Sequence, residues 1–464
     1  MKVLVLNPPG KKIYTRDYYC SKVSKSDYIY QPIDLLVLSG LLNQKHEISV
    51  LDAIAEKMDK KTCLRKITGY NYDAIIFLTG SVSWEEDARF IKELKNNNNF
   101  LAIGTGDILL ADYKNLMEKN DFLDAVILDF TTADILRYLD GQYDLVENMA
   151  FWQNGKIIDK GAMREFNKEI SVPPARYGLF PNKKYHYPFV RRHPFATILT
   201  DYGCPFKCNF CVMNTIGFKY RSVNDVIAEI KEIKKLGFKN IYFGDQTFGA
   251  NQERLTEICN FMIKAGINLG WVCWSRVDVV NEELLKLMKR AGCHTILFGV
   301  ESSNDEILKQ NNKGFTAAQV KNTFQICRKL GIRTLGTFIF GLPGEDKESC
   351  RRTIDFAKEI GADFASFNVL IPRMNTKIRE EAIGRGWVDK EVKIMDQSGS
   401  FAVMGNDKIS AAEIMELKDE AVRSFYFRPA YLWRRLISIG SWYELRLLMA
   451  NGFALLKNTL KIKI

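Results

Sequence analysis

Residues 199–213 read Leu-Thr-Asp-Tyr-Gly-Cys-Pro-Phe-Lys-Cys-Asn-Phe-Cys-Val-Met and place Cys204, Cys208 and Cys211 close together in the chain. A glycine and a proline on either side of the first cysteine keep a helix or a strand from running through this stretch. We therefore expect a loop that closes on a metal. An iron–sulfur cubane usually takes four cysteine ligands, so three would leave one iron open to an exogenous ligand.

Two other interpretations of the cysteines are open at this point. They could form a zinc knuckle, or they could cluster without binding anything. A zinc site would need a fourth cysteine or histidine at short spacing, and the next candidate, His193, lies well upstream of Cys204. The spacing therefore favours the iron–sulfur interpretation.

The C-x3-C-x2-C array, with aromatic Phe210 before its last cysteine, resembles the signature of the radical S-adenosylmethionine (radical SAM) superfamily. The resemblance implies a [4Fe-4S] cluster on Cys204, Cys208 and Cys211 whose open iron chelates the amino and carboxylate groups of SAM. It also implies that one electron passed to the sulfonium yields methionine and a 5′-deoxyadenosyl radical, which abstracts hydrogen from a substrate. No catalytic residue beyond the cluster ligands is implied.

Strands and helices alternate downstream of the cysteines. Periodicity predicts helices over 223–236, 251–265, 281–290, 316–330 and 346–360, and strands over 195–200, 240–243, 269–274, 294–299, 332–340 and 363–370. This order resembles the partial (β/α)6 barrel of the TIM type found in radical SAM enzymes. Barrel chemistry belongs at the carboxyl ends of the strands.

Four predicted strand ends carry residues that resemble the family's SAM contacts. Alone, each could be a helix cap, a salt bridge or a turn, but together and in order they favour a SAM site. The candidate residues, with Phe210, are Asp245 after the second strand, Arg276 after the third, Glu301 and Ser302 after the fourth, and Phe340 and Gly341 after the fifth. Arg276 could pair with the SAM carboxylate, because its guanidinium is a fixed fork of donors.

The first 140 residues also alternate. Strands are predicted over 2–6, 47–51, 73–78, 100–103 and 125–128, which indicates a parallel, doubly wound, Rossmann-like sheet. The stretches Leu6-Asn7-Pro8-Pro9-Gly10 and Val50-Leu51-Asp52-Ala53 resemble the cobalamin-binding domain of one radical SAM subfamily. The candidate cobalamin contacts are Pro8, Pro9, Thr79 and Gly104. Two later motifs of that subfamily are missing, so the domain either binds cobalamin or is a degenerate fold that serves as a scaffold.

The α/β chain is thus expected to comprise a cobalamin-binding-type domain over 1–140, a linker over 141–190 with a short hairpin around Asn154-Gly155, a barrel over 191–395 and a helical region over 396–464. Of the net charge of +11, residues 421–464 supply eight cations against one acid. This basic, aromatic tail either packs on the barrel or lies on the inner face of an anionic membrane. No apolar run reaches the roughly 18 residues of a spanning helix, so we expect a cytoplasmic protein.

The resulting hypothesis is a radical SAM enzyme, with methylation of an unactivated carbon if cobalamin is bound. The alternatives are radical cyclisation, oxidation or rearrangement without methyl transfer, and a non-catalytic iron–sulfur binding or regulatory module. The expected partners are a small hydrophobic substrate and an external one-electron donor. Nucleic acid is not expected as a partner, because no RNA-binding module follows the barrel. The seven other cysteines are expected to be small buried side chains.

Overall fold

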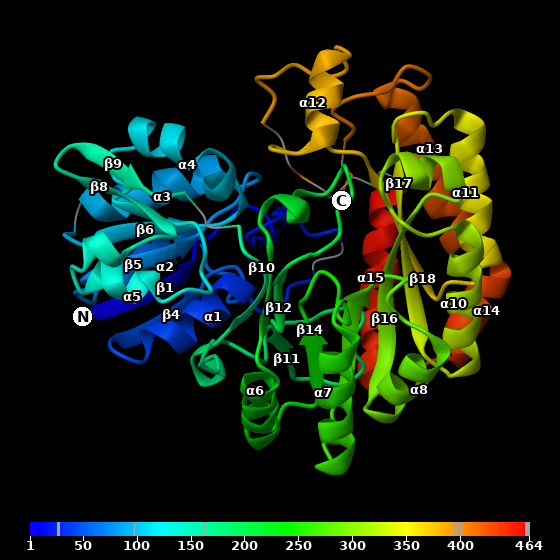
Figure 1. Cartoon of the computed structure of the whole chain (residues 1–464), viewed down its shortest axis with the longest axis horizontal. Coiled ribbons are helices and arrows are strands. Elements are labelled where there is room, and N and C mark those ends of the chain that lie inside the picture. The colour runs from blue at the N-terminus through cyan, green and yellow to red at the C-terminus, as the bar shows by residue number, and fades with distance from the viewer. Residues whose placement is uncertain are drawn as a thin grey trace. The chain divides into compact units, whose positions relative to one another are not determined.

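The computed structural model describes residues 1–25, 28–96, 98–161, 164–393, 396, 399 and 401–459. It divides into two compact units (Figure 1). The N-terminal unit comprises Met1–Ser24, Tyr28–His186 and Ile216–Leu236, and the barrel unit comprises Lys25–Asp27, Tyr187–Thr215 and Gly237–Ile464. Both units contain parallel sheets, so the predicted α/β class is confirmed.

The N-terminal unit is built on a seven-stranded sheet in the order β4-β1-β5-β6-β7-β8-β9. Its parallel strands are β1 (Lys2–Asn7), β4 (Glu47–Asp52), β5 (Ala74–Leu78), β6 (Leu101–Thr105) and β7 (Ala125–Ile127). The first parallel strand therefore lies between the second and the third. In a sheet of this order the strand order reverses between β1 and β5, and the crevice for a ligand lies at their carboxyl ends.

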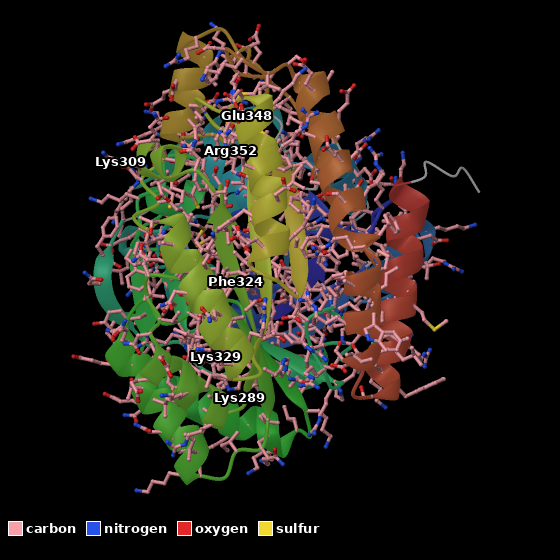
Figure 2. The ribbon with its side chains drawn as sticks, turned by 90° about the vertical axis from the view of Figure 1, so that its right-hand side faces the viewer. Lys289, Lys309, Phe324, Lys329, Glu348 and Arg352 are labelled. Carbon is pink, nitrogen blue, oxygen red and sulfur yellow. The ribbon has the colours of Figure 1, made fainter. Side chains whose placement is uncertain are left out.

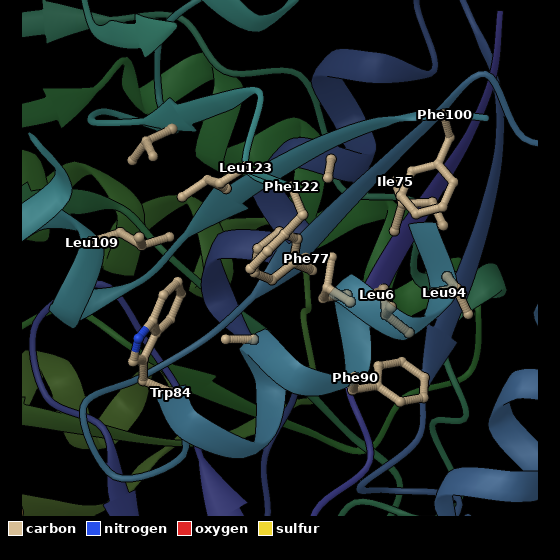
Figure 3. Close-up of a cluster of buried hydrophobic side chains, with 14 of the residues drawn as sticks. Leu6, Ile75, Phe77, Trp84, Phe90, Leu94, Phe100, Leu109, Phe122 and Leu123 are labelled. Atoms are coloured by element: carbon tan, nitrogen blue, oxygen red, sulfur yellow. The ribbon is translucent and has the colours of Figure 1, made fainter. Parts of the chain in front are cut away.

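The strands of this sheet are apolar on both faces because helices cover them. These helices are α1 (Ile33–Leu42), α2 (Lys60–Thr68), α3 (Trp84–Asn96), α4 (Asp107–Lys119) and α5 (Asp134–Leu139). Figure 3 shows part of the resulting core, where Leu6 of β1 and Phe77 of β5 lie in one cluster with Phe90 of α3. The predicted strands are confirmed, whereas α2, α4 and α5 were not predicted from the sequence.

The predicted hairpin around Asn154-Gly155 is confirmed, but it is not part of a linker. Strands β8 (Met149–Gln153) and β9 (Lys156–Asp159) pair antiparallel, and β8 pairs antiparallel with β7, so the hairpin extends the sheet. Asn154 and Gly155 have φ values of 51° and 73°, as the tight turn requires. The alternation of apolar residues in β8 was too short for sequence analysis to assign it to the sheet.

The remaining elements of the N-terminal unit are short. Strands β2 (Tyr14–Thr15) and β3 (Lys22–Val23) pair antiparallel, and β10 (Phe166–Ile170) pairs parallel with β13 (Phe218–Arg221). Two 3-10 turns, Tyr143–Leu145 and Tyr177–Leu179, and helix α6 (Val223–Lys235) complete the unit. Ser222 caps α6 by accepting a hydrogen bond from the backbone N–H of Asp225.

The barrel unit contains six parallel strands in the order of the chain, β11-β14-β15-β16-β17-β18. They are β11 (Phe195–Ile198), β14 (Asn240–Phe243), β15 (Gly270–Ser275), β16 (Cys293–Glu301), β17 (Arg333–Phe340) and β18 (Phe364–Val369). Helices α7 (Gln252–Lys264), α8 (Glu282–Arg290), α9 (Asp305–Gln310), α10 (Ala317–Lys329) and α11 (Lys347–Glu359) connect them. The predicted partial barrel is confirmed, and α9 is an addition to it.

The barrel helices carry charges at both ends of their outer face. Figure 2 shows Glu348 and Arg352, which form an ion pair one turn apart on α11, and Lys289 and Lys329 in the last turns of α8 and α10. Cations in a last turn interact favourably with the helix dipole.

The C-terminal region consists of several helices and not of one continuous helical stretch. They are α12 (Lys377–Gly384), α13 (Ala411–Tyr426), α14 (Pro429–Ile437) and α15 (Trp442–Thr459). Pro429 begins α14 because proline is compatible only with the first turn of a helix. Within the described part of the chain, none of the helices has the length and apolar character needed to cross a membrane.

One buried acid of the N-terminal unit has no hydrogen-bond partner. Asp34, in the first turn of α1, is fully buried, and neither of its carboxyl oxygens is hydrogen-bonded. Burial, reinforced by the nearby Asp17, raises the pKa of Asp34 well above its usual value of 3.8. The folded protein therefore holds this carboxyl in its neutral form.

We predict that Asp34 makes the protein less stable as pH rises. The folded state keeps a proton that the unfolded chain releases above its usual pKa, so the free energy of unfolding falls as pH rises above about 4. Asp34→Asn removes this proton linkage and should flatten the fall. Urea denaturation across this range measures it, with the exposed Asp121→Asn as the charge-matched control. Parallel curves for wild type and Asp34→Asn would contradict the prediction.

Candidate iron–sulfur and cofactor site

The cysteine loop is fixed at its base by a buried carboxylate. Asp245, directly after β14, accepts hydrogen bonds at Oδ1 from the backbone N–H groups of Thr200 (2.6 Å) and Asp201 (2.8 Å). Its Oδ2 accepts the Thr200 hydroxyl at 2.8 Å. The residue predicted as a SAM contact is therefore fully buried and engaged with the chain that leads into the cysteines. Contact of Asp245 with SAM stays a prediction.

The three thiols lie on the loop that follows β11 and the short strand β12 (Asp201–Gly203). Cys204 and Cys208 are buried and Cys211 is partly exposed. The Thr247 hydroxyl lies 3.4 Å from the Cys204 sulfur, and the backbone N–H of Cys211 donates to the Cys208 carbonyl at 3.1 Å. Burial, with the neighbouring Cys208 and Cys204, raises the pKa of Cys211 to about 12. The three thiols therefore lie on one loop, although the described residues contain no group of cysteine, histidine or acidic side chains already close enough together to hold a metal ion.

The far side of the loop is held by the segment that follows α9. The backbone N–H of Asn209 donates to the Asn311 carbonyl at 3.2 Å, and its side-chain amide donates to the Gln310 carbonyl at 2.9 Å. Asn312 in turn donates its side-chain amide to the Asn209 side-chain oxygen at 2.7 Å. These bonds fix the backbone between Cys208 and Cys211.

Arg276, at the end of β15, lies against the cysteine loop. Its Nη1 is 3.5 Å from the Cys208 sulfur, and its guanidinium lies 3.8 Å from the centre of the Phe206 ring. Its Nε and Nη2 donate to Asp278 at 2.9 and 2.7 Å. Arg276 was predicted to pair with the SAM carboxylate, and that role stays a prediction. The contacts of this structure make it a positioning group for the loop.

Lys313 is a second cation at the thiols that sequence analysis missed. It is buried, and its Nζ donates to Oε1 of Glu301 at 2.7 Å. Burial alone would lower the pKa of Lys313, but Glu301 and Cys208 raise it, so the ammonium stays charged. Phe210, the aromatic residue of the cysteine motif, lies 5.6 Å from this ammonium. Nothing in the sequence around Lys313 distinguishes it from a surface lysine.

The other predicted SAM contacts form one hydrogen-bonded group. Glu345 accepts the backbone N–H groups of Gly341 (2.9 Å) and Leu342 (3.0 Å), and the Ser302 hydroxyl lies 3.5 Å from its other oxygen. Gly341 has a φ of 89°, and a Cβ there would lie 2.7 Å from Ile414 of α13. The glycine thus allows the C-terminal helix to approach. Phe340 is fully buried and stacks on Phe367.

The charges around the thiols suit an anionic cluster. Arg276 and Lys313 face Cys208, and buried Arg373 favours the thiolate of Cys211. A cubane held by three thiolates carries a net charge of roughly −1 when oxidised and one more negative charge when reduced. Three buried cations offset this charge, and bound iron keeps coordinating thiols deprotonated. The residues present therefore fit a [4Fe-4S] cluster with three protein ligands.

The N-terminal unit has a separate candidate site at the carboxyl ends of β1 and β5. Arg16 spans these ends: its Nη1 donates to Oδ1 of Asn7 (2.8 Å) and to the Pro8 carbonyl (3.0 Å), and its Nη2 pairs with Asp87 (2.7 Å). Thr79 donates its hydroxyl to Asp87 at 2.8 Å. Pro8 and Thr79, two of the predicted cobalamin contacts, thus form hydrogen bonds within the protein. Their contact with a ligand stays a prediction.

The other predicted contacts here are Pro9, which is buried, and Gly104. A Cβ on Gly104 would lie 2.4 Å from the Leu109 side chain, so this glycine serves packing. Asp34, in the first turn of α1, is fully buried and neutral, so we assign it no contact with a ligand.

Comparisons with known proteins agree with this geometry. Residues 198–357 match the family model of the radical SAM superfamily. Over 444 residues the chain is 28% identical to an uncharacterized methyltransferase of Pyrococcus horikoshii, which covers 93% of this chain and 94% of that protein. Over 327 residues it is 28% identical to the anaerobic magnesium-protoporphyrin IX monomethyl ester cyclase of Cereibacter sphaeroides, covering 67% of this chain and 51% of the cyclase.

A solved structure extends the likeness of fold to the whole chain. The radical S-adenosylmethionine methyltransferase TsrM from Kitasatospora setae, with cobalamin and a [4Fe-4S] cluster bound, superposes with a TM-score of 0.69. The superposition covers 99% of each chain at 16% sequence identity. The two proteins therefore share a fold, in both the doubly wound sheet and the barrel.

We predict that Lys313 raises the reduction potential of the cluster. Lys313→Met removes a buried positive charge beside Cys208, which should lower the potential on the order of tens of millivolts. A redox titration of the reconstituted protein, followed by electron paramagnetic resonance, measures it. Lys309→Met removes an exposed charge four residues earlier and is the matched control (Figure 2). An unchanged potential in Lys313→Met would contradict the prediction.

Proposed function

We propose, from the premise that the chain belongs to the radical SAM superfamily, that it is an enzyme that methylates a carbon atom of a small hydrophobic molecule with the help of cobalamin. The observation that carries the proposal is that one loop presents Cys204, Cys208 and Cys211, with Nη1 of buried Arg276 3.5 Å from the Cys208 sulfur. When bound there, the cluster supplies one electron to SAM, whose cleavage gives methionine and a 5′-deoxyadenosyl radical. The residues of this chain hold the cluster and balance its charge.

The cations of the barrel that lie next to the thiols balance the negative charge of the cluster. Passing an electron to the cluster adds a negative charge in a site largely shielded from water, which is costly unless cations lie nearby. Arg276 and Lys313 lie against the same cysteine and are themselves held by Asp278 and Glu301. They therefore keep fixed positions while the charge of the cluster changes. This arrangement suits repeated reduction by a separate one-electron donor, which we include in the proposal.

Cobalamin is supported by the N-terminal unit and by the relatives. The sheet order favours a ligand crevice at the ends of β1 and β5. The TsrM structure, which shares the fold, has cobalamin bound. When bound, cobalamin would supply a carrier for the methyl group. His46, just before β4, lies at the amino end of its strand and so at the opposite edge of the sheet, so we assign it no role toward the cobalt.

The likeness to the cyclase of Cereibacter sphaeroides supports a second candidate reaction, which is radical cyclisation without methyl transfer. The methyltransferase of Pyrococcus horikoshii matches nearly the whole length of both chains, whereas the chain spans about half of the cyclase. The relatives therefore favour methyl transfer. Contact of residues 421–464 with the inner face of a membrane would suit a hydrophobic substrate in either reaction.

We predict that the anaerobically reconstituted protein releases 5′-deoxyadenosine when given dithionite and SAM. Cys208→Ala removes one of three ligands and should lose most of the about four irons of a cubane, together with this release. Cys63→Ala, which shortens a buried cysteine of the N-terminal unit, is the matched control and should keep both. Full iron content in Cys208→Ala, or no release by the wild type, would refute the assignment of these thiols.

Two further measurements on the same reconstituted protein test the role of cobalamin. Titration with hydroxocobalamin should give a stoichiometric complex, and SAM with a deuterated methyl group should yield a product that carries the label. A protein that releases 5′-deoxyadenosine but binds no corrinoid would support the cyclisation class of reaction and refute cobalamin-dependent methylation.

A further inference from the structure

Helix α14 exposes its apolar side chains. Leu432, Trp433, Leu436 and Ile437 are 53%, 66%, 58% and 66% exposed. Residues four apart lie above one another on a helix, so these four form two adjacent columns on one side. We call this surface the α14 apolar face. Surface helices ordinarily show polar residues to solvent and bury an apolar stripe, and α14 does the reverse.

The other side of α14 attaches the helix to the barrel with polar groups. Arg434 donates to the carbonyls of Gly361 (3.2 Å) and Ala362 (2.6 Å), at the turn before β18. The Tyr431 hydroxyl donates to the Asp363 carbonyl at 3.2 Å. Arg435 is buried, with its guanidinium 4.4 Å from the centre of the Phe364 ring. Because these contacts hold the helix in place, the α14 apolar face is not needed for folding of the barrel.

Helix α15, which follows α14, also exposes large apolar side chains. Trp442 begins α15 after a connection of four residues and is 74% exposed, and Met449, further along α15, is 66% exposed. Tryptophan prefers the boundary between lipid and water, where its ring meets an apolar phase and its N–H a polar one. The exposed groups of α14 and α15 are thus of the type found at a membrane surface.

The charges of residues 421–464, the segment that contains the α14 apolar face, are almost all positive. Arg423 and Arg446 are exposed, and residues 421–464 contain a single acid, Glu444. Glu444 is not available to a partner, because its Oε1 pairs with Arg191 at 2.9 Å and with Arg333 at 2.7 Å. The region therefore offers a binding partner apolar side chains and positive charge, with no free carboxylate.

We propose that the α14 apolar face docks on an anionic membrane surface. Apolar and aromatic side chains would enter the boundary between headgroups and acyl chains, and Arg423 and Arg446 would lie among anionic headgroups. A second copy of the chain fits less well, because a symmetric contact would bring the same arginines of both copies together. The proposal concerns α14 and α15 alone and does not depend on the reaction catalysed in the barrel.

The test is flotation of the full-length reconstituted protein with vesicles. We expect it to float with vesicles of phosphatidylcholine and phosphatidylglycerol, much less with phosphatidylcholine alone, and less at high salt. Trp433→Glu with Ile437→Glu should weaken the partition coefficient about tenfold or more. Tyr70→Glu with Phe166→Glu removes two exposed aromatic residues of the N-terminal unit at the same change in charge, and should bind as the wild type does.

Further variants and measurements test whether misfolding or self-association explains a loss of vesicle binding. Iron content and thermal unfolding should be the same in all variants, because none of the four positions is buried. If the glutamate pair fails to fold, Trp433→Ala with Ile437→Ala keeps the net charge and should weaken binding by a smaller factor. Absence of flotation with anionic vesicles, or equal loss in the control pair, would overturn the proposal. A dimer that the α14 variants dissociate, without vesicle binding, would overturn it in favour of self-association.

Discussion

The three hydrogen bonds that Asp245 accepts from Thr200 and Asp201 are the constraint on which the cluster site depends. They join the end of β14 to the chain that leaves β11, so neighbouring strands of the barrel set the start of the cysteine loop. Asp201 continues this link by pairing with Arg254 of α7 at 2.5 Å. The buried carboxyl of Asp245 satisfies the N–H groups of Thr200 and Asp201 and so fixes the start of the loop that contains Pro205.

Charge is the second constraint on the site. Three thiolates in one buried loop would repel one another, and burial, together with the neighbouring Cys208 and Cys204, raises the pKa of Cys211. Arg276, Lys313 and Arg373 oppose that repulsion from different sides. Two of the cations are held by carboxylates of their own, Asp278 and Glu301, and Glu301 has a φ of 69°, which is uncommon for a residue other than glycine.

The architecture of both sheets could be predicted well because strands and helices alternate regularly along the chain. The three cysteines, the six barrel strands and the five parallel strands of the N-terminal sheet were all accessible in this way. Sequence reasoning did not identify Lys313, Thr247 or Glu345, because their positions depend on contacts between distant segments. It also did not identify the packing at Gly104 and Gly341, where Leu109 and Ile414 occupy the space that a side chain would need. Contact of these two glycines with a ligand stays a prediction.

The central claim is that three cysteines of this chain hold a cubane with one iron left open for SAM. Mössbauer spectroscopy of the protein reconstituted with iron-57 tests this most directly. We expect that adding SAM shifts the signal of one iron of the four and leaves the others unchanged, because only the iron without a cysteine ligand is free to bind it. Four irons that all keep their signals in the presence of SAM would contradict the account.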